Sequence, residues 1–422
     1  MLQVAYIRAH KEEVIERLAV KNFHAKEIIE ELIVLDERRR NTQSDNDAIL
    51  AESNKLSKEI GELFKSGNVE QANAKKTETA LLKEKTKVLQ QVLSETQESL
   101  ERKLVQIPNI PNKSVPKGIS EQDNEVVSQE GEIPNLGENA KPHWELVAEK
   151  NIIDFELGVK ITGAGFPVYR GKGARMQRAL INYFLDKNIA AGYEEIMPPL
   201  LVNEASGFGT GQLPDKEGQM YHATEDNLYL IPTAEVPVTN IFRNVIVKKE
   251  DLPLKCTAYT PCFRREAGSY GKDVRGLNRL HQFDKVEIVQ IQHPDDSYKA
   301  LDVMVEHVAG ILRELGLPFR ILKLCGGDLG FTSALTFDFE VYSAAQEKWL
   351  EVSSVSNFES YQSNRLKLRF KDEDKKTTLC HSLNGSALAL PRIMAALIEN
   401  YQDAEGITIP EVLVPYCGFN KI

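Results

Sequence analysis

Residues 261–287 read PCFRREAGSYGKDVRGLNRLHQFDKVE, two runs typical of β-strands joined by a loop that contains three glycines. The stretch carries four arginines, at positions 264, 265, 275 and 279. A guanidinium group stays charged and can hold phosphate oxygens in a bidentate way, and the ring of Phe283 can stack on a purine or a guanidinium. The pattern predicts a β-hairpin that binds a polyphosphate and one flat aromatic partner, although a solvent-exposed ribbon would look the same.

The second half of the chain contains groups of expected strands, with amphipathic helices set apart from them. The expected strands span residues 228–232, 255–263, 283–291 and 334–342, and the expected helices span 174–187, 297–315 and 388–401. The chain has no regular strand–helix–strand alternation and lacks both GxGxxG and GxxxxGK[ST], so neither a Rossmann nor a P-loop nucleotide site is expected. We therefore expect an α+β fold with an antiparallel sheet flanked by helices.

Residues from about 26 to 102 have the composition of long helices, with no proline and two glycines. Apolar residues recur at intervals of seven, which predicts two antiparallel helices, at about 26–65 and 69–102, joined by a tight turn at 66–68. The expected seam is interrupted by Arg39, Asn46 and Ser53. Its apolar members include Leu32, Leu56, Leu81, Leu82, Val88 and Leu89.

The distal part of this coiled-coil arm is basic, since residues 55–87 contain eight lysines and five glutamates. Coiled hairpins often serve as struts or oligomerisation devices, but lysines on a long lever suit the phosphate backbone of an RNA. We expect an N-terminal helical domain at 1–106, a linker rich in proline, asparagine and glycine at 107–127, and a second domain at 128–422.

The overall composition narrows the class of protein. A net charge of −10 argues against non-specific binding of polyanions by the whole surface. Five cysteines without a CxxC spacing, and no secretory signal, are typical of reduced thiols in a cytoplasmic protein, and no structural zinc is expected. No run approaches the roughly 20 apolar residues that a membrane span needs.

Four further clusters carry chemistry. In IPTAE (231–235), Thr233 and Glu235 would lie on one side of an extended backbone and suit an ammonium group, although Thr233 could instead cap a helix. EVSS (351–354) presents oxygen ligands that suit Mg²⁺ carried in by a phosphate chain. A buried Glu287 could read a hydroxyl, and the small residues of 382–391 lead to Arg392, which would face a γ-phosphate. Together the clusters supply the parts needed to activate a carboxylate with ATP.

Over nearly its full length the chain resembles the bacterial-type seryl-tRNA synthetases, which are class II aminoacyl-tRNA synthetases. Residues 262–287 resemble the family's motif 2, residues 384–402 its motif 3 and residues 179–203 its motif 1, while IPTAE and EVSS are further signatures. The resemblance implies a class II antiparallel sheet, ATP, Mg²⁺, L-serine and tRNA(Ser), with a homodimer formed through motif 1. It also allows tRNA(Sec) as a second substrate.

The resemblance assigns roles to individual residues. Catalytic roles fall on Arg264, Arg279 and Arg392, and Mg²⁺ would be held by Glu351 and Ser354. ATP contacts fall on Arg264, Arg265, Glu266, Arg279, Leu280, Phe283, Glu351, Val352, Ser353, Ser354 and Arg392. Serine contacts fall on Thr233, Ala234, Glu235, Arg264, Glu287, Asn384 and Ser386.

The expected reaction is attack of the serine carboxylate on the α-phosphorus of ATP, followed by transfer of the seryl group to the terminal ribose of tRNA. Arg264 would bridge the α-phosphate and the carboxylate. Two alternatives remain open on the sequence alone. One is a class II paralogue that charges another carrier, and the other is a non-catalytic RNA-binding scaffold that keeps the fold.

Overall fold

The computed structural model describes residues 1–138, 140–215, 217–266 and 275–422. It divides into two compact units. The helical unit contains residues 2–19 and 23–108, and the sheet unit contains residue 1, residues 20–22 and residues 109–422. The loop 267–274 of the arginine hairpin, expected from the sequence to join its two strands, lies outside the described residues.

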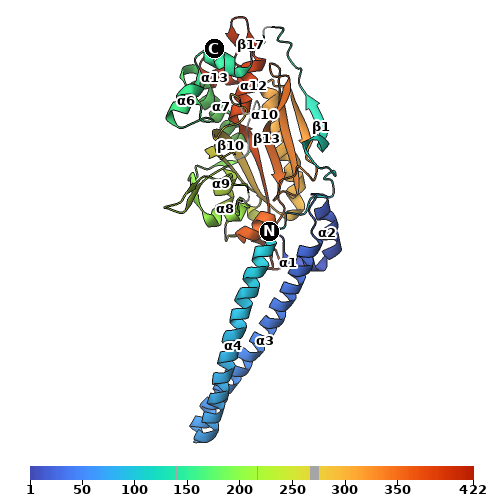
Figure 1. Ribbon diagram of the computed structural model, residues 1–422, viewed down its shortest axis with the longest axis vertical. Helices are drawn as coiled ribbons and strands as arrows, with labels where there is room; N and C mark the ends of the chain where they lie inside the picture. The colour runs from blue at the N-terminus through green and yellow to red at the C-terminus, as the bar shows by residue number, and fades with distance from the viewer. Residues whose placement is uncertain (139, 216, 267–274) are drawn as a thin grey trace. The chain divides into compact units, whose positions relative to one another are not determined.

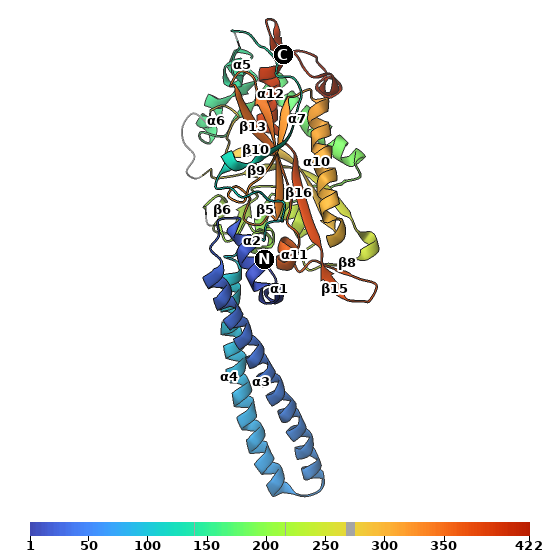
Figure 2. The same ribbon diagram turned by 90° about the vertical axis from the view of Figure 1, so that its right-hand side faces the viewer.

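The helical unit consists of two short and two long helices, shown in blue in Figures 1 and 2. They are α1 (Val4–Ala9), α2 (Lys11–Ala19), α3 (Lys26–Lys65) and α4 (Val69–Leu104). Helices α3 and α4 pack against each other along their length. Gly67 has a φ of 79° in the turn between them, a left-handed conformation that glycine adopts without strain.

The seam between α3 and α4 contains a polar residue at Asn46, where the sequence predicted an interruption. Leu32, Leu56 and Leu82 are buried, but Asn46 is buried among them, and its Oδ1 has no hydrogen-bond partner among the described residues. Leu81 and Val88 were expected at the seam, and this was wrong, because they are 63% and 61% exposed. Neighbouring positions of a helix differ by about 100° in direction, so Leu81 turns away when Leu82 faces the partner helix.

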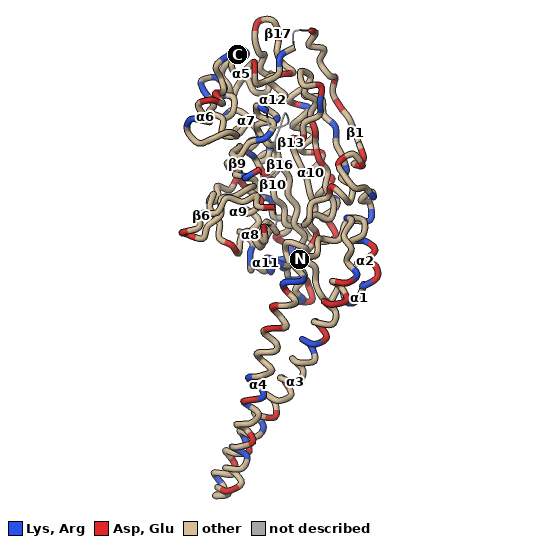
Figure 3. The backbone as a smooth tube through the Cα atoms, in the orientation of Figure 1, with Lys and Arg blue, Asp and Glu red and all other residues tan. Residues whose placement is uncertain are grey.

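Charges of both signs follow the arm. Figure 3 shows lysine and glutamate positions interspersed along the distal parts of α3 and α4. Lys75 of α4 forms an ion pair with Glu59 of α3. This lysine therefore contributes to the pairing of the helices.

The sheet unit is built on a sheet of eight strands in the described part of the chain, and this confirms the expected α+β fold. All neighbouring strands in it are antiparallel except β4 and β9. Their order across the sheet is β1 (Glu125–Glu130), β11 (Phe319–Lys323), β12 (Leu335–Ser343), β13 (Lys348–Asn357), β16 (His381–Ala389), β10 (Gln282–Gln292), β9 (Leu254–Phe263) and β4 (Glu194–Glu195).

The three longest helices of the sheet unit's described residues pack on this sheet: α7 (Gly171–Ala190), α10 (Ser297–Glu314) and α12 (Leu390–Asn400). Helix α7 contacts β9 and β10, α10 contacts β13 and β16, and α12 contacts β10, β12 and β13. Their apolar residues form one core with those of the strands. Strand β1 begins at Glu125, so the last residues of the expected linker 107–127 belong to the sheet.

Shorter elements surround the main sheet. The helices among them are α5 (His143–Glu149), α6 (Phe155–Ile161), α8 (Glu204–Thr210), α9 (Glu235–Asn240), α11 (Tyr361–Leu366) and α13 (Val414–Cys417). The strands are β2 (Ile153–Asp154), β3 (Val168–Tyr169), β5 (Leu201–Asn203), β6 (His222–Ala223), β7 (Leu228–Leu230), β8 (Ile246–Lys248), β14 (Arg369–Lys371), β15 (Thr377–Leu379), β17 (Gln402–Asp403) and β18 (Gly406–Ile407).

Strand alternation separates the core from the other face of the sheet. In β10, Val286 and Ile288 belong to the core, while Lys285 and Glu287 line a cleft. In β16, Leu383 belongs to the core and Asn384 lines the cleft. Because successive side chains of a strand point to opposite faces, the same strands support both the core and the site.

The five cysteines are unpaired and buried. None of the helices in the described part of the chain combines the length and the apolar composition that crossing a bilayer requires.

Candidate active site

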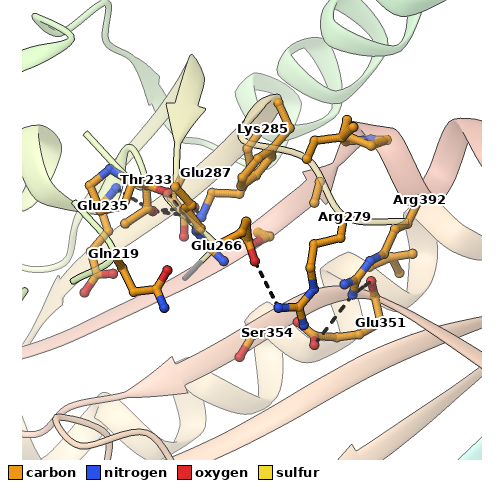
Figure 4. A pocket seen from close by; sticks show the side chains of 18 of the residues that line it. Gln219, Thr233, Glu235, Glu266, Arg279, Lys285, Glu287, Glu351, Ser354 and Arg392 are labelled. Atoms are coloured by element: carbon orange, nitrogen blue, oxygen red, sulfur yellow. Dashed lines mark hydrogen bonds and ion pairs between the residues drawn. The ribbon is translucent and has the colours of Figure 1, made fainter. Parts of the chain in front are cut away.

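A cleft of about 540 Å³ opens over β10, β13 and β16. Most of the side chains that the sequence predicted for the site line this one cleft. They are Thr233, Glu235, Arg264, Glu266, Arg279, Leu280, Phe283, Glu287, Glu351, Val352, Ser354, Asn384, Ser386 and Arg392. Figure 4 shows Arg279, Arg392 and Glu351 at one end, and Thr233, Glu235 and Glu287 at the other.

Three predicted residues are not among the described residues that line the cleft. Ala234 is fully buried in a small apolar cluster under it. The hydroxyl of Ser353 donates to the backbone oxygen of Ser386 at 2.5 Å, which ties β13 to β16. Arg265 is exposed, and its backbone N–H donates to the backbone oxygen of Gln219 at 2.8 Å.

The sequence interpretation missed several lining residues, above all Lys285. Period-two counting from Phe283 to Glu287 passes through Lys285, so the signal for it was present. Gln219 and Asn278 also line the cleft, but they come from segments without a regular period.

The end of the cleft that carries Arg279 and Arg392 is rich in cations that are already paired. Arg279 Nη1 donates to Glu266 Oε2 at 3.0 Å. Arg392 Nη1 donates to the backbone oxygen of Glu351 at 2.8 Å and lies 3.7 Å from its carboxylate. An anionic ligand at this end would therefore compete with two carboxylates for the guanidinium groups.

Arg264 lines the same cleft. Its Nε donates to the backbone oxygen of Pro232 at 3.3 Å, and its guanidinium lies 5.2 Å from the centre of the Phe283 ring. The backbone N–H of Arg264 donates to the backbone oxygen of His281 at 2.9 Å, across the hairpin. Backbone pairing and the aromatic ring thus hold the guanidinium beside the sheet.

Thr233 and Glu235 meet at the opposite end of the cleft. The expectation that an extended backbone brings them together was wrong, because Ala234 is helical (φ −63°, ψ −20°) and α9 begins at Glu235. The backbone N–H of Glu235 donates to Thr233 Oγ1 at 3.2 Å, so the hydroxyl bonds the start of α9 and also faces the cleft. Thr233 Oγ1 donates to Glu287 Oε2 at 3.3 Å.

Burial raises the pKa of Glu235 to about 7, and the neighbouring carboxylate of Glu287 adds to this shift. Gln362, Lys285 and Asn384 act in the opposite direction. Gln362 Nε2 donates to Glu235 Oε1 at 2.6 Å. Because burial disfavours the ionised carboxylate, this end favours a ligand that brings a positive charge.

A second acidic residue, Asp338, lies near Glu351, and its register partner in the sheet is Ser354. Burial raises the pKa of Asp338 well above its usual range, and Glu351 adds to the shift, although a hydrogen bond to Ser354 opposes it. Asp338 Oδ1 has no hydrogen-bond partner among the described residues. Among all the residues that the structure describes, no group of three His, Cys, Asp or Glu side chains could hold a metal ion by itself.

A buried histidine, His143, holds the segment that leads into the second strand of the arginine hairpin. The backbone N–H of Leu277 donates to His143 Nε2 at 2.8 Å, so the ring proton must lie on Nδ1, which is 2.6 Å from Glu399 Oε1. Glu399 belongs to α12, as does Arg392. This network ties the segment that carries Arg279 and Leu280 to the same helix as Arg392.

Arg275 comes two residues before Leu277, and its side chain lies against Trp144. It is exposed, and its guanidinium lies 5.2 Å from the centre of the Trp144 ring. Arg275 is not among the described residues that line the cleft.

Comparisons with known proteins agree with this geometry. Residues 219–401 match the family tRNA synthetase class II core domain (G, H, P, S and T), and residues 1–111 match the family seryl-tRNA synthetase N-terminal domain. The chain is 49% identical to the serine–tRNA ligase of Salinibacter ruber, covering 100% of this chain and 99% of the relative. It is 46% identical to the serine–tRNA ligase of Akkermansia muciniphila over the same shares.

Solved structures give the same result. The seryl-tRNA synthetase of Pyrococcus horikoshii, complexed with ATP, superimposes with a TM-score of 0.92 at 32% identity, covering 100% of this chain and 99% of that one. The cytoplasmic serine–tRNA ligase of Naegleria fowleri, in complex with AMP, gives a TM-score of 0.87 at 27% identity, covering 100% and 98%.

Proposed function

This chain belongs to the seryl-tRNA synthetase family, and we propose that the cleft over β10, β13 and β16 is where it joins L-serine to ATP. Members of the family are aminoacyl-tRNA ligases, and this chain has that activity with serine and tRNA(Ser) as substrates. The observation that carries the placement is the division of the cleft, with paired arginines at one end and buried carboxylates at the other.

In the proposed reaction, a carboxylate oxygen of serine attacks the α-phosphorus of ATP, and the bond from that phosphorus to the pyrophosphate oxygen breaks. The products are seryl adenylate and pyrophosphate. A hydroxyl of the terminal tRNA ribose then attacks the seryl carbonyl carbon and AMP leaves. The serine carboxylate is already ionised, so the first step needs no general base, and catalysis depends on alignment and charge stabilisation.

Arg264, Arg279 and Arg392 are the proposed catalytic residues. Arg264, which lines the cleft beside Phe283, would hold the serine carboxylate and the α-phosphate together. Arg279 and Arg392 would hold the outer phosphates after releasing Glu266 and Glu351, since phosphate oxygens carry more charge than one carboxylate. Phe283 and the backbone of Leu280 would hold the adenine.

Mg²⁺ is the proposed metal. Glu351 and Ser354 offer oxygen ligands, and the carboxyl group of Asp338, which hydrogen-bonds Ser354, can orient that hydroxyl. Two protein ligands suit Mg²⁺, which keeps several waters and takes the rest of its shell from phosphates. When bound, the ion supplies positive charge against the phosphate chain. Val352 and Ser353 would act through the backbone of this strand.

At the serine end, Thr233 and Glu235 would accept hydrogen bonds from the α-ammonium group. Glu287 would accept one from the side-chain hydroxyl. Asn384 and Ser386 complete the proposed subsite from β16. Ala234 supports this subsite from below, and Arg265 would contribute charge at the cleft's edge.

The remaining assignments concern the whole chain. We propose that residues 1–106 form a tRNA-binding domain with the α3–α4 arm, that 107–127 form a linker and that 128–422 form the catalytic domain. A cytoplasmic homodimer and a second substrate, tRNA(Sec), are also proposed. The homodimer is supported by exposed apolar residues in 179–203, since Met197, Leu200 and Leu201 are 90%, 38% and 45% exposed.

One experiment tests the proposal directly: pyrophosphate exchange with each of the twenty amino acids, followed by charging of total tRNA. We expect exchange that depends on serine, and charging of serine acceptors alone or with tRNA(Sec). Exchange that depends on another amino acid would overturn the assignment.

Replacing Glu287 with glutamine is expected to reduce discrimination against alanine. A buried carboxylate that pairs with the substrate hydroxyl is left unsatisfied by alanine, a penalty that reaches about 10⁴-fold. The measurement is kcat/KM in pyrophosphate exchange for serine and for alanine. E235Q is the matched control, because it weakens the amine contact that both amino acids share. An unchanged serine-to-alanine ratio in E287Q would rule out Glu287 as the hydroxyl reader.

The KM for serine is expected to rise about tenfold as the pH falls from 8 to 6. The reason is that the pKa of Glu235 is raised to about 7, and only its ionised carboxylate binds an ammonium group. At lower pH the carboxyl group of Glu235 must lose its proton before serine can bind. E235Q should bind serine more weakly and lose this pH dependence, and the KM for ATP serves as an internal reference. If E235Q kept the same profile, another group would be responsible.

A further inference from the structure

Lys285 lies at the serine end of the cleft, on the β10 face that also carries Glu287 (Figure 4). It is 6% exposed. Its Nζ donates to Thr233 Oγ1 at 2.7 Å and forms an ion pair with Glu287. Lysine is rarely buried to this degree unless its charge is paired, and here its partners are two groups that the proposed function gives to serine.

The hydroxyl of Thr233 has no hydrogen-bonding capacity left in this arrangement. A threonine hydroxyl has one proton to donate and two lone pairs. Oγ1 donates to Glu287 at 3.3 Å, and it accepts from the backbone N–H of Glu235 at 3.2 Å and from Lys285 at 2.7 Å. A substrate ammonium can therefore bond Thr233 only if one of these partners leaves.

Of the three partners, Lys285 is the one that can leave. The N–H of Glu235 is fixed by the start of α9, and Glu287 accepts the hydroxyl proton rather than occupying a lone pair. Lys285 ends in a flexible four-carbon chain. Two ammonium groups on the same acceptors would also repel each other, so the arrival of one favours the departure of the other.

Charge balance explains why a lysine lies at this end of the cleft. Glu235 and Glu287 are both buried and close enough for Glu287 to raise the pKa of Glu235. Arg279 and Arg392 have carboxylate partners at the other end of the cleft. Lys285 compensates the two carboxylates until a substrate brings its own positive charge.

We propose that Lys285 is the resident cation of the ammonium subsite, and that it releases Thr233 when the ammonium of an amino acid binds. The released Nζ needs a new acceptor, and the carboxylate of the same amino acid supplies it. The exchange makes the subsite selective for amines that carry a carboxylate, because a simple amine displaces Lys285 without offering it a partner. This inference rests on the proposed binding of serine at this end.

Ethanolamine is the probe, since it is serine without the carboxylate. We expect its dissociation constant, measured by calorimetry on the full-length protein, to be at least about tenfold lower for K285M than for the wild type, because the amine fills the vacated cation site. K285R keeps a cation there and should show no gain. Ethylene glycol, which has the hydroxyl but no charge, should bind neither variant better. Equal affinity of ethanolamine for the wild type and K285M would overturn the proposal.

A second measurement uses the wild type and does not depend on how K285M folds. In a crystal structure with serine bound, the distance from Lys285 Nζ to Thr233 Oγ1 should grow from 2.7 Å to more than about 3.5 Å. A distance that stays at 2.7 Å would overturn the exchange. Neither measurement uses enzymatic activity, so a failure of the proposed function, seen as absent serine-dependent exchange in the wild type, is recognised separately.

Discussion

Replacing Arg264 with alanine is expected to lower kcat for serine-dependent pyrophosphate exchange by about 10²–10³-fold, or about 3–4 kcal/mol of transition-state stabilisation. The guanidinium lines the cleft beside Phe283 and is anchored to the backbone of Pro232, where it can align the serine carboxylate with the α-phosphate. R264K should recover only part of the loss, because an ammonium group keeps the charge but lacks the planar fork that can hold two oxygen groups.

R275A is the matched control for Arg264. It removes an exposed arginine from the same hairpin, one that packs on Trp144 outside the cleft. We expect R275A to change exchange by less than about threefold, since surface substitutions away from a site have small effects. Equal losses in R264A and R275A would show that the hairpin acts through its overall charge, and the bridging role of Arg264 would be wrong.

Deleting residues 30–98 is expected to reduce tRNA charging by at least about 10³-fold while serine-dependent pyrophosphate exchange stays within about threefold of the wild type. The deleted residues form most of α3 and α4 and carry the lysine-rich distal part of the arm. Exchange uses only serine and ATP, and the cleft residues all belong to the sheet unit. The two activities should therefore separate.

A variant with an intact arm distinguishes RNA binding from a role as a strut. Seven lysines of the distal arm can be replaced by glutamine while Lys75 is kept, because it pairs with Glu59 across the two helices. This variant should retain its helices, as measured by circular dichroism, and charge tRNA poorly, with a shallower dependence on salt. Normal charging by this variant would assign the arm a purely structural role.

Loss of both activities in the deletion variant would contradict the separation of the two units' roles. Exchange without charging of any tRNA, in the wild type, would favour a paralogue that loads another carrier. The absence of serine-dependent exchange would favour a scaffold that keeps the fold without the activity.

The sequence predicted the long helices and the face of β10 well, because both depend on local periodicity. Apolar residues at intervals of seven predicted α3 and α4, and alternation in the second strand of the hairpin placed Phe283 and Glu287 on one face. The sequence predicted the buried residues of the arm less well where two adjacent apolar residues could each occupy the seam. Leu81 and Leu82 both suit a seam, and only the packing of α3 on α4 decides which of them is buried.

The backbone conformation that brings Thr233 and Glu235 together could not be predicted from the sequence, for a similar reason. Both residues belong to the site, but an extended chain and a helix start could each bring them together. The start of α9, packed under β10, decides the matter and directs the N–H of Glu235 to the threonine hydroxyl. Residue type alone does not distinguish these two backbones.

By itself the sequence determined the chemistry of this protein, because arginines, carboxylates and hydroxyls in these motifs identify what the site can bind. The tertiary structure alone decided how those groups are paired within the cleft. Two of the ion pairs join different segments of the chain: Arg279 with Glu266, and Arg392 with Glu351. The third pair, Lys285 with Glu287, joins alternate positions of β10. The physical reason is that a charge becomes paired through distance and burial, which arise only when the sheet brings distant segments together.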